Sequence, residues 1–151
     1  MKNIPIIIDP IINSGSGKKL VTENNLKFLT KKVYPLSDLL TPNIYEYNKI
    51  KKNIKKNSIN NILITNFNTN KKSITLKLIK NNPEIEKDFI IEKFYKVYHG
   101  TGCTFSTAVA CNIGLNNDVN RSIQEALKYM KKVITKSSII GKNQSFLNRN
   151  F

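Results

Sequence analysis

Short apolar runs alternate with segments of helical periodicity, and this alternation limits the possible folds more than any other feature. The runs at 4–8 (IPIII), 37–40 (SDLL) and 60–65 (NNILIT) each have the length of a strand. The segments 22–33 and 41–54 lie between them, and their apolar residues recur three to four positions apart. Strands that alternate with helices predict an α/β fold with a mostly parallel sheet flanked by helices.

The first two helical segments carry signals for where they begin and end. Thr22 is placed to cap the first helix, and Pro35 to end it. The apolar face of this helix consists of Leu26, Leu29 and Val33. In the second segment we expect Thr41 to be the cap and Pro42 to lie in the first turn. The apolar face of the second helix consists of Ile44, Tyr47, Ile50 and Ile54.

The rest of the chain is interpreted in the same way. Residues 73–79 alternate between apolar and polar types, as in a half-exposed strand, and residues 88–98 form another extended segment. Helices are expected at 102–115 and 119–137, followed by a loop-like tail at 139–151. The apolar stripe of the last helix consists of Val119, Ile123, Ala126, Leu127, Met130, Val133 and Ile134.

The formal net charge of +15 does not by itself indicate a nucleic-acid-binding protein. Lysine supplies 23 of the 25 basic residues and arginine only 2, while asparagine and isoleucine each occur 22 times. Lysine, asparagine and isoleucine share A/T-rich codons, so a biased genome accounts for their surplus. Arginine would be expected at contacts with phosphates and bases. We therefore expect a solvated lysine face and do not expect nucleic acid as a partner.

Length and cysteine content place further bounds on the protein. We expect one domain over residues 1–151, large enough to bury a core of its own. No apolar run approaches the roughly 20 residues of a membrane-spanning helix, and residues 1–10 are interpreted as a strand, not a signal peptide. Cys103 and Cys111 lie two helical turns apart, too far for a disulfide, so we expect free thiols, with Cys111 in the core. These features favour a cytoplasmic protein without a membrane partner.

The segment HGTGC at 99–103 differs from the rest of the chain in composition. Gly100 and Gly102 permit backbone conformations that other residues avoid, and a helix is expected to begin at once. The first N–H groups of that helix have no partner inside it, so they form a site suited to phosphate. Cys103 lies in the positive field of the helix dipole, which favours its thiolate. On spacing alone, a glycine turn with Cys103 as a small apolar filler stays open as the alternative, and His99 is interpreted as a loop hydrogen-bonder.

Three ordered blocks of the sequence resemble one enzyme family. HGTGCTFSTAVA resembles the H-G-T-G-C-T-L-S-A-A signature of hydroxymethylpyrimidine/phosphomethylpyrimidine kinases, members of the ribokinase-like superfamily. IPIIIDPIINSGSGKKL resembles their V-V-x-D-P-V-M…S-G-x-x-L-L, and VYPLSDLLTPNIYEY resembles their L-P-L-A-x-x-I-T-P-N-x-x-E-A. The resemblance implies a ribokinase-like fold. It also implies ATP-dependent phosphorylation of hydroxymethylpyrimidine and its monophosphate in thiamine biosynthesis.

The resemblance also implies roles for individual residues. Cys103 would accept a proton from the hydroxymethyl group or phosphate of the substrate, and Gly100, Thr101 and Gly102 would hold the transferring phosphoryl group. Asn43 and Glu46 match the segment near the nucleotide phosphates and magnesium. Asp9, also expected at the cofactor, matches the aspartate that ends a central strand, at the carboxyl edge where open α/β sheets bind ligands. Of these, Glu46 would be the one at the metal, and the implied cofactors are ATP and Mg²⁺. From the residues alone, a turn aspartate before Pro10 stays open as the alternative for Asp9, and Asn43 and Glu46 are interpreted as a polar first helical turn.

Several departures from the family pattern leave other functions open. The resemblance covers nearly the whole chain but only the C-terminal part of the family's length, so we expect a fold truncated at its N-terminus. The family's remaining part carries much of the pocket for the pyrimidine, which implies a complementary N-terminal chain or a homo-oligomer as partner. The family's K-G-G-H is TNFN at 65–68, so a lysine that would neutralise phosphate is missing. This loss favours a degenerate, non-catalytic remnant as the alternative, ahead of a lysine-rich nucleic-acid-binding module.

Overall fold

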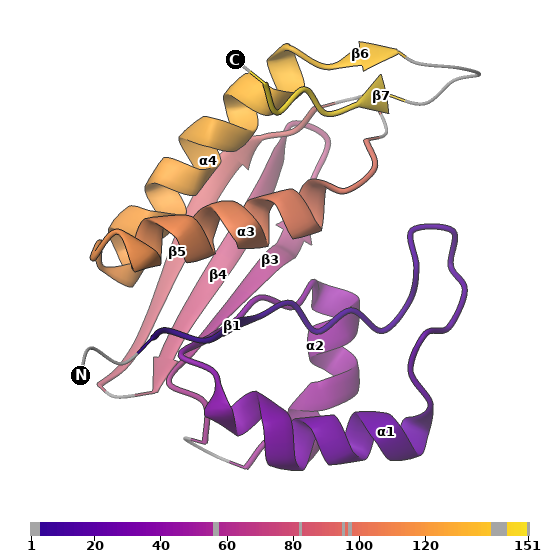
Figure 1. Cartoon of the computed structure of the whole chain (residues 1–151), viewed down its shortest axis with the longest axis vertical. Coiled ribbons are helices and arrows are strands. Elements are labelled where there is room, and N and C mark those ends of the chain that lie inside the picture. Colours follow the sequence, from indigo (N-terminus) through magenta and orange to yellow (C-terminus); the bar gives the residue numbers. More distant parts are fainter. Residues whose placement is uncertain are drawn as a thin grey trace. The chain divides into compact units, whose positions relative to one another are not determined.

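The computed structural model describes residues 4–55, 58–81, 83–94, 96, 98–139 and 145–150. The chain forms two compact units, one of Ile6–Lys93 and one of Phe94–Phe151 with Met1–Pro5. Figure 1 labels most of the helices and strands of both units.

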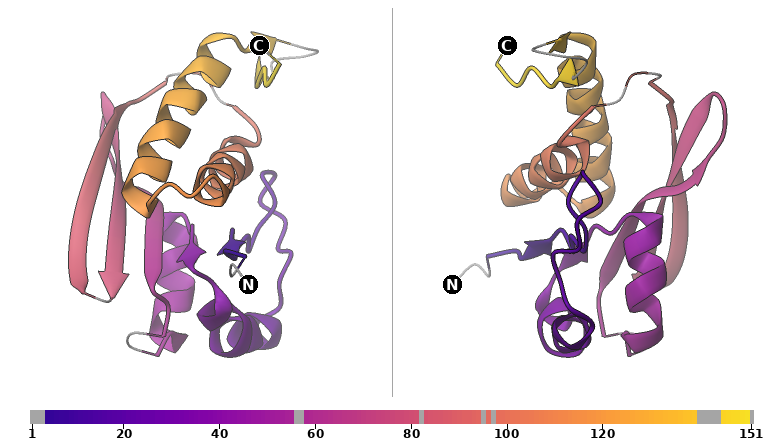
Figure 2. Two further views of the ribbon diagram at one scale, coloured as in Figure 1. Left: turned by 60° about the vertical axis from the view of Figure 1, so that its left-hand side comes forward. Right: turned by 90° about the vertical axis from the view of Figure 1, so that its right-hand side faces the viewer.

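The unit Ile6–Lys93 contains a five-stranded sheet whose strands lie side by side in chain order. The strands are β1 (Ile7–Ile8), β2 (Leu39–Leu40), β3 (Asn61–Thr69), β4 (Ser73–Asn81) and β5 (Glu84–Glu92). The first three strands run parallel to one another, whereas β3 pairs with β4 and β4 with β5 in antiparallel fashion. The long strands β3 to β5 form a twisted ribbon (Figure 2). The α/β class is confirmed, and the sheet is mixed, with two of its four pairings parallel.

Some strands differ in length from the expectation. β1 has two residues instead of the five at 4–8, because Pro5 and Pro10 flank it and proline has no N–H to donate to a ladder. β5 begins at Glu84, which pairs with Asn81 at the end of β4. It ends at Glu92, well before the expected end at residue 98.

Short helical segments join the first three strands. They are α1 (Glu23–Phe28), a π-helical turn (Leu29–Val33), a 3-10 turn (Tyr34–Leu36), α2 (Ile44–Ile50) and a second 3-10 turn (Lys51–Asn53). Thr22 is confirmed as the cap of α1, since its side chain accepts a hydrogen bond from the Asn25 N–H at 3.3 Å. The prediction that Thr41 caps α2 is wrong. Asn43 is the cap, and the Thr41 N–H instead donates to the Ile8 carbonyl at 3.0 Å, as a continuation of strand pairing.

One apolar cluster forms the core between these helices and the sheet. Its buried members are Ile12, Tyr34, Leu40, Ile50, Ile59, Ile62 and Ile64. The partly buried side chains packed against it include Leu26, Leu29, Val33, Ile44, Tyr47 and Ile54. Both predicted helix faces are therefore confirmed. Each fully buried side chain of this size contributes about 1.5–3 kcal/mol by leaving water, so this cluster is the main support of the strand ends.

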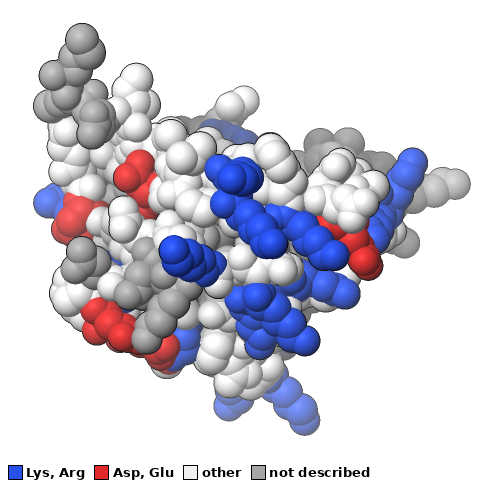
Figure 3. Space-filling model, turned by 90° about the horizontal axis from the view of Figure 1, so that it is seen from below, with Lys and Arg blue, Asp and Glu red and all other residues white. Residues whose placement is uncertain are grey.

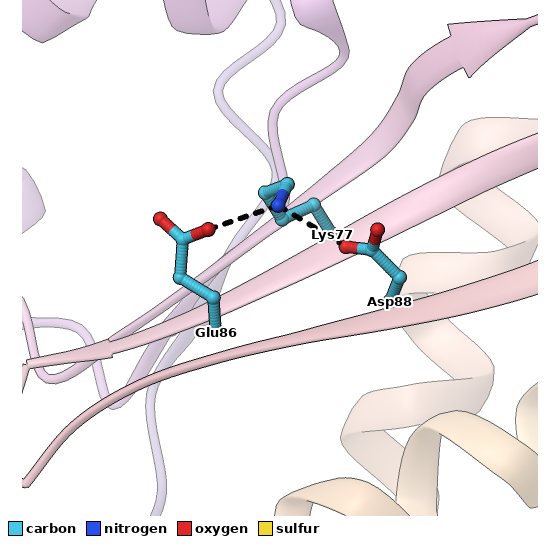
Figure 4. A network of polar contacts seen from close by, with 3 residues as sticks. All are labelled: Lys77, Glu86 and Asp88. Atoms are coloured by element: carbon cyan, nitrogen blue, oxygen red, sulfur yellow. Dashed lines mark hydrogen bonds and ion pairs between the residues drawn. The ribbon is translucent and has the colours of Figure 1, made fainter.

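The exposed face of the β4–β5 ribbon carries a polar network (Figure 4). The Lys77 Nζ donates to the Glu86 carboxylate at 2.9 Å, lies 3.3 Å from the Asp88 carboxylate and lies 4.8 Å from the centre of the Phe67 ring. The hydrogen bond to Glu86 raises the pKa of Lys77. On the other face of β4, Leu76 and Leu78 are buried. This burial on one face explains why apolar and polar residues alternate along the strand.

The second unit contains two helices and a short strand pair. These are α3 (Thr101–Gly114), α4 (Val119–Thr135), β6 (Ser138–Ile139) and β7 (Ser145–Phe146). Asp118 caps α4 by accepting the Arg121 N–H at 3.1 Å. The buried residues of the predicted α4 stripe are Ile123, Ala126, Met130, Val133 and Ile134. The tail was expected to be a loop, but β6 and β7 pair antiparallel there; residues 140–144 lie outside the described residues.

The two cysteines are free thiols, as expected, and both are exposed. The prediction that Cys111 belongs to the core is wrong. The buried side of α3 includes Phe105 and Val109. Cys111 follows Val109 by two positions, which places it about 200° further around the helix.

The excess of basic residues is spread over the surface. Figure 3 shows a face on which Lys and Arg side chains gather at the centre and right, while most of its Asp and Glu side chains lie on the left. Because 25 basic residues occur with only 10 acidic ones, most of the lysine charge must be balanced by solvent ions. Within the described part of the chain, no helix has the length and apolar character needed to span a membrane.

Candidate functional site

The residues predicted to form the site fall into two groups, one in each unit. Asp9, Asn43 and Glu46 belong to the unit Ile6–Lys93, whereas Gly100–Cys103 belong to the unit with α3 and α4. The first group follows the carboxyl ends of parallel strands, where open α/β sheets bind ligands. The second group forms the start of a long helix.

Gly100 makes the turn that begins α3. It is the N-cap residue and has φ 77° and ψ 13°, in the left-handed region that favours glycine. The first hydrogen bond inside the helix runs from the Thr104 N–H to the Gly100 carbonyl at 3.0 Å. The N–H groups of Thr101 and Gly102 precede this bond, so they have no acceptor inside the helix. Together with the helix dipole, they make this turn attractive to an anion.

The turn is open to solvent on the side of Gly102. Apart from its chain neighbours and the nearby backbone of α3, no atom lies within 4 Å of the place where a Cβ at this position would be. Gly102 and Cys103 are both exposed, and Cys103 is the third residue of the helix. The alternative interpretation of Cys103 as buried apolar filler is therefore wrong. An anion can approach this turn next to the sulfur.

An arginine that the sequence analysis did not select lies at the same turn. The Nε and Nη2 of Arg149 donate to the hydroxyl of Thr104 at 3.1 and 2.9 Å. A Cβ at Gly100 would lie 3.2 Å from the same Nη2. The one available signal was composition, since Arg149 is one of only two arginines among 25 basic residues.

Asp9, Asn43 and Glu46 are organised by the end of β2 and the start of α2. The side chain of Asn43 accepts the Glu46 N–H at 2.9 Å, and Glu46 accepts the Asn43 N–H at 2.8 Å. This reciprocal pair is a capping box. Asp9 directly follows β1, and its negative charge raises the pKa of Glu46. The structure therefore brings these three predicted residues into one electrostatic group.

Glu46 is the most unusual ionisable group of this set. Only 6% of it is exposed, and this burial is the main reason that its pKa is raised above the ordinary value of 4.5. The nearby charge of Asp9 raises the pKa further, whereas hydrogen bonds from the backbone of Asn43 and Ile12 lower it. Burial and the Glu46 carboxylate raise the pKa of Tyr34 in turn. A group at Glu46 that brought positive charge would relieve this repulsion.

The segment that replaces the family's K-G-G-H also meets the start of α2. The Asn66 side chain accepts the Ile44 N–H at 2.7 Å, and the Thr65 N–H donates to the Pro42 carbonyl at 2.9 Å. Thr65 stands where the family has its lysine. In the first turn of α2, the N–H groups of Ile44 and Glu46 therefore already donate to side chains of this chain. Sequence reasoning missed Asn66 because its partner is 22 residues away.

The described residues contain no group of three or more His, Cys, Asp or Glu that would hold a metal ion. Asp9 and Glu46 are a pair of neighbouring acidic residues. Mg²⁺ needs only one or two carboxylates when phosphate oxygens and waters supply its other ligands. The pair therefore fits a magnesium ion that arrives with a nucleotide better than a permanently held metal.

A cavity of about 190 Å³ lies elsewhere in the unit Ile6–Lys93. Its lining includes Tyr47, Ile62, Asn81 and Glu84, which come from the end of α2 and from the β3 start, β4 end and β5 start. These positions are at the amino end of β3, opposite to the carboxyl ends that carry Asp9 and Asn43. The cavity is therefore not part of the predicted site.

Comparison with known proteins identifies the family. The family model described as phosphomethylpyrimidine kinase matches residues 1–148. The chain belongs to this family. A hydroxymethylpyrimidine/phosphomethylpyrimidine kinase of Aquifex aeolicus is 27% identical over 156 residues, which cover 95% of this chain and 61% of the relative. The bifunctional thiamine biosynthesis protein ThiDN of Methanocaldococcus jannaschii is 32% identical over 147 residues, covering 95% of this chain and 33% of that protein.

Solved structures of related kinases support the fold. A Bacillus subtilis pyridoxal kinase in complex with ADP superposes with a TM-score of 0.76 at 19% identity, over 95% of this chain and 58% of that chain. A Staphylococcus aureus pyridoxal kinase in complex with AMP-PCP and pyridoxal gives 0.78 at 14% identity, over 96% and 57%. The ribokinase-like fold expected from the sequence is confirmed. The chain spans about three-fifths of the length of the hydroxymethylpyrimidine/phosphomethylpyrimidine kinases from Aquifex and Staphylococcus.

Proposed function

We propose that this chain takes part in the ATP-dependent phosphorylation of hydroxymethylpyrimidine, and then of its monophosphate, in thiamine biosynthesis. The observation that carries the proposal is the start of α3. There a left-handed Gly100 opens a helix whose first N–H groups, at Thr101 and Gly102, stand beside an exposed Cys103. The family match over residues 1–148 supplies the reaction class.

The turn at α3 would hold the transferring phosphoryl group. Phosphoryl transfer depends mainly on positioning and on stabilising charge, which N–H groups at a helix start provide. The substrate hydroxyl oxygen forms a bond to the γ-phosphorus, and the bond from that phosphorus to the β,γ-bridging oxygen breaks, releasing ADP. The Cys103 thiolate accepts the hydroxyl proton. In the second phosphorylation, a phosphate oxygen of the monophosphate takes the place of the hydroxyl.

Asp9, Asn43 and Glu46 would bind the phosphates of the nucleotide and the metal ion that accompanies them. Glu46 is held by hydrogen bonds from the Asn43 and Ile12 backbone, and it would hold the magnesium ion together with Asp9. The ion would supply charge stabilisation on the phosphate oxygens. Its positive charge would also lower the free-energy cost of keeping the buried Glu46 ionised.

The substrate pocket requires more than the residues described here. This chain matches 61% of the Aquifex relative, and the family resemblance implies that the unmatched part includes the segment before the match. Whether that sequence is in the same polypeptide, in a complementary chain or in a second copy, we propose that it completes the pyrimidine site. We place the reaction in the cytoplasm, where two free thiols persist.

A second candidate is a family member that has kept the fold but lost the activity. The observation that favours it is the loop at 65–68, in which Thr65 stands in place of a phosphate-neutralising lysine. In the same loop, the side chain of Asn66 accepts the hydrogen bond of the Ile44 N–H at the start of α2. Such a protein would keep the core and the turn at Gly100 without transferring phosphate.

Two measurements separate the candidates. Calorimetric titration of the purified chain with MgATP tests the phosphate site, and production of ADP with hydroxymethylpyrimidine tests the reaction. The reaction is measured with the chain alone and with the preceding part of the Aquifex relative added. We expect ATP binding in both cases and turnover once the site is complete. Binding without turnover in the completed site supports the remnant, and no binding refutes both the kinase proposal and the phosphate site.

A further inference from the structure

Arg149 is placed at the start of α3 by contacts within a single unit. The backbone bridge between Tyr98 and Ser145 ties the tail to the segment that leads into the turn. β7 pairs with β6, and the tail then reaches Arg149 three residues after Phe146. The position of the guanidinium is therefore fixed from both sides of the turn.

Thr104 anchors the guanidinium. Its hydroxyl accepts both the Nε and the Nη2 hydrogen bonds of Arg149, and only 7% of Thr104 is exposed. A guanidinium has five N–H donors, so two are used here and three remain. Nη1 has no acceptor among the described residues. No carboxylate pairs with Arg149 in that part of the chain.

This placement is electrostatically unfavourable for the chain on its own. The start of a helix carries partial positive charge, and a cation next to it is repelled. Arg149 lies beside Gly100, the cap residue, since a Cβ added there would lie 3.2 Å from Nη2. An anion bound in the turn removes the repulsion and accepts the unused donors of the guanidinium.

We propose that Arg149 binds the terminal phosphate of ATP at the α3 turn. This inference rests on the proposed kinase function. The guanidinium and the N–H groups of Thr101 and Gly102 together hold the transferring phosphoryl group. Because only ATP has a third phosphate, Arg149 makes the site prefer ATP to ADP.

The test is the ratio of ATP to ADP affinity, measured by calorimetry on the full chain. In Arg149→Gln we expect ATP affinity to fall about tenfold to a hundredfold, the range of a charge-assisted hydrogen bond, and ADP affinity to change little. Arg121→Gln is the matched control, since it removes the other arginine from an exposed position on α4. Arg149→Lys keeps the charge and should retain most of the preference for ATP.

A purely structural Arg149 gives a different result. If it only ties the tail to Thr104, Arg149→Gln lowers the melting temperature and leaves the ATP-to-ADP ratio at the parent value, which overturns the inference but not the kinase function. If Arg149→Gln does not fold, the measurement passes to Thr104→Val, which releases the guanidinium. A ratio reduced about threefold to tenfold supports the inference, and an unchanged ratio overturns it. A parent chain that binds neither nucleotide overturns both proposals.

Discussion

Asn43 and Glu46 satisfy each other's backbone N–H groups, at 2.9 and 2.8 Å, across the first turn of α2. The residues that the family resemblance assigns to the nucleotide therefore also build the helix that positions them. A substitution here changes stability and ligand binding together. The two effects are separated by choosing changes that alter the cap without the charge, or the charge without the cap.

Asn43→Ala removes the cap of α2 and leaves the charge of Glu46 in place. We expect the free energy of unfolding to fall by about 1 kcal/mol, the usual cost of losing such a cap. Urea denaturation followed by circular dichroism measures the change. Asn48→Ala, at an exposed position of the same helix, is the control and should change stability by less than about 0.5 kcal/mol. Equal effects of the two substitutions would show that the capping box does not stabilise α2.

Glu46→Gln removes the buried charge and keeps the cap, because glutamine also completes a capping box. The pKa of Glu46 is raised in the folded protein, so folding favours its protonated form. The resulting stability is fully present below the unfolded pKa, near 4.5, and is lost as the pH rises through the higher folded value. We expect the stability of the variant relative to the parent to increase over this interval and then to level off. Urea denaturation at a series of pH values measures the difference, and a flat difference curve contradicts the burial of an ionised Glu46.

The apolar spacing of the sequence predicted the helix faces well, because side chains three to four residues apart share one side of a helix and must be covered together. Leu26, Leu29 and Val33 pack on the core as expected. The start of α2 was predicted wrongly, because Thr41 followed by Pro42 was interpreted as the beginning of the helix although the sequence holds a stronger helix-start signal. That signal was present: asparagine at 43 followed three residues later by glutamate is a capping-box pattern.

The parts of the site that sequence reasoning missed depend on distant partners. Arg149 and Thr104 are 45 residues apart in the sequence, and Asn66 and Ile44 are 22 residues apart. No local sequence pattern predicts either contact. The turn at Gly100 was predictable because its requirements are local: a residue that accepts positive φ, then a helix. Cys111 was misplaced because an apolar helix does not reveal which of its small residues faces the solvent.

Gly100→Ala tests the local requirement for glycine at the α3 turn. The native φ of 77° is disfavoured for alanine by about 1–2 kcal/mol, and its Cβ would lie 3.2 Å from Arg149. We expect the free energy of unfolding to fall by at least about 1 kcal/mol. Thermal and urea denaturation measure this loss. A variant as stable as the parent would mean that the turn relaxes to another conformation, and its crystal structure would show the change.

Gly102→Ala has the opposite expectation for stability. This position is helical, and nothing lies within 4 Å of an added Cβ, so alanine should stabilise α3 by about 0.5–1 kcal/mol. The same methyl group occupies the space where the proposed phosphoryl group approaches the turn. We therefore expect MgATP affinity to fall by about tenfold or more while the melting temperature rises. Unchanged MgATP affinity would place the phosphate elsewhere.

Cys103→Ala tests the proton acceptor in the completed enzyme. Loss of a general base typically lowers kcat by about 10² to 10⁴, so we expect a decrease in this range for the phosphorylation of hydroxymethylpyrimidine. MgATP affinity should stay within about threefold of the parent, because the N–H groups of the turn do not depend on the thiol. Cys111→Ala is the matched control: it removes the other exposed thiol from the same helix and should leave kcat unchanged. Turnover by Cys103→Ala at the parent rate would show that the sulfur takes no proton, and a loss shared by both variants would point to packing of α3 instead of chemistry.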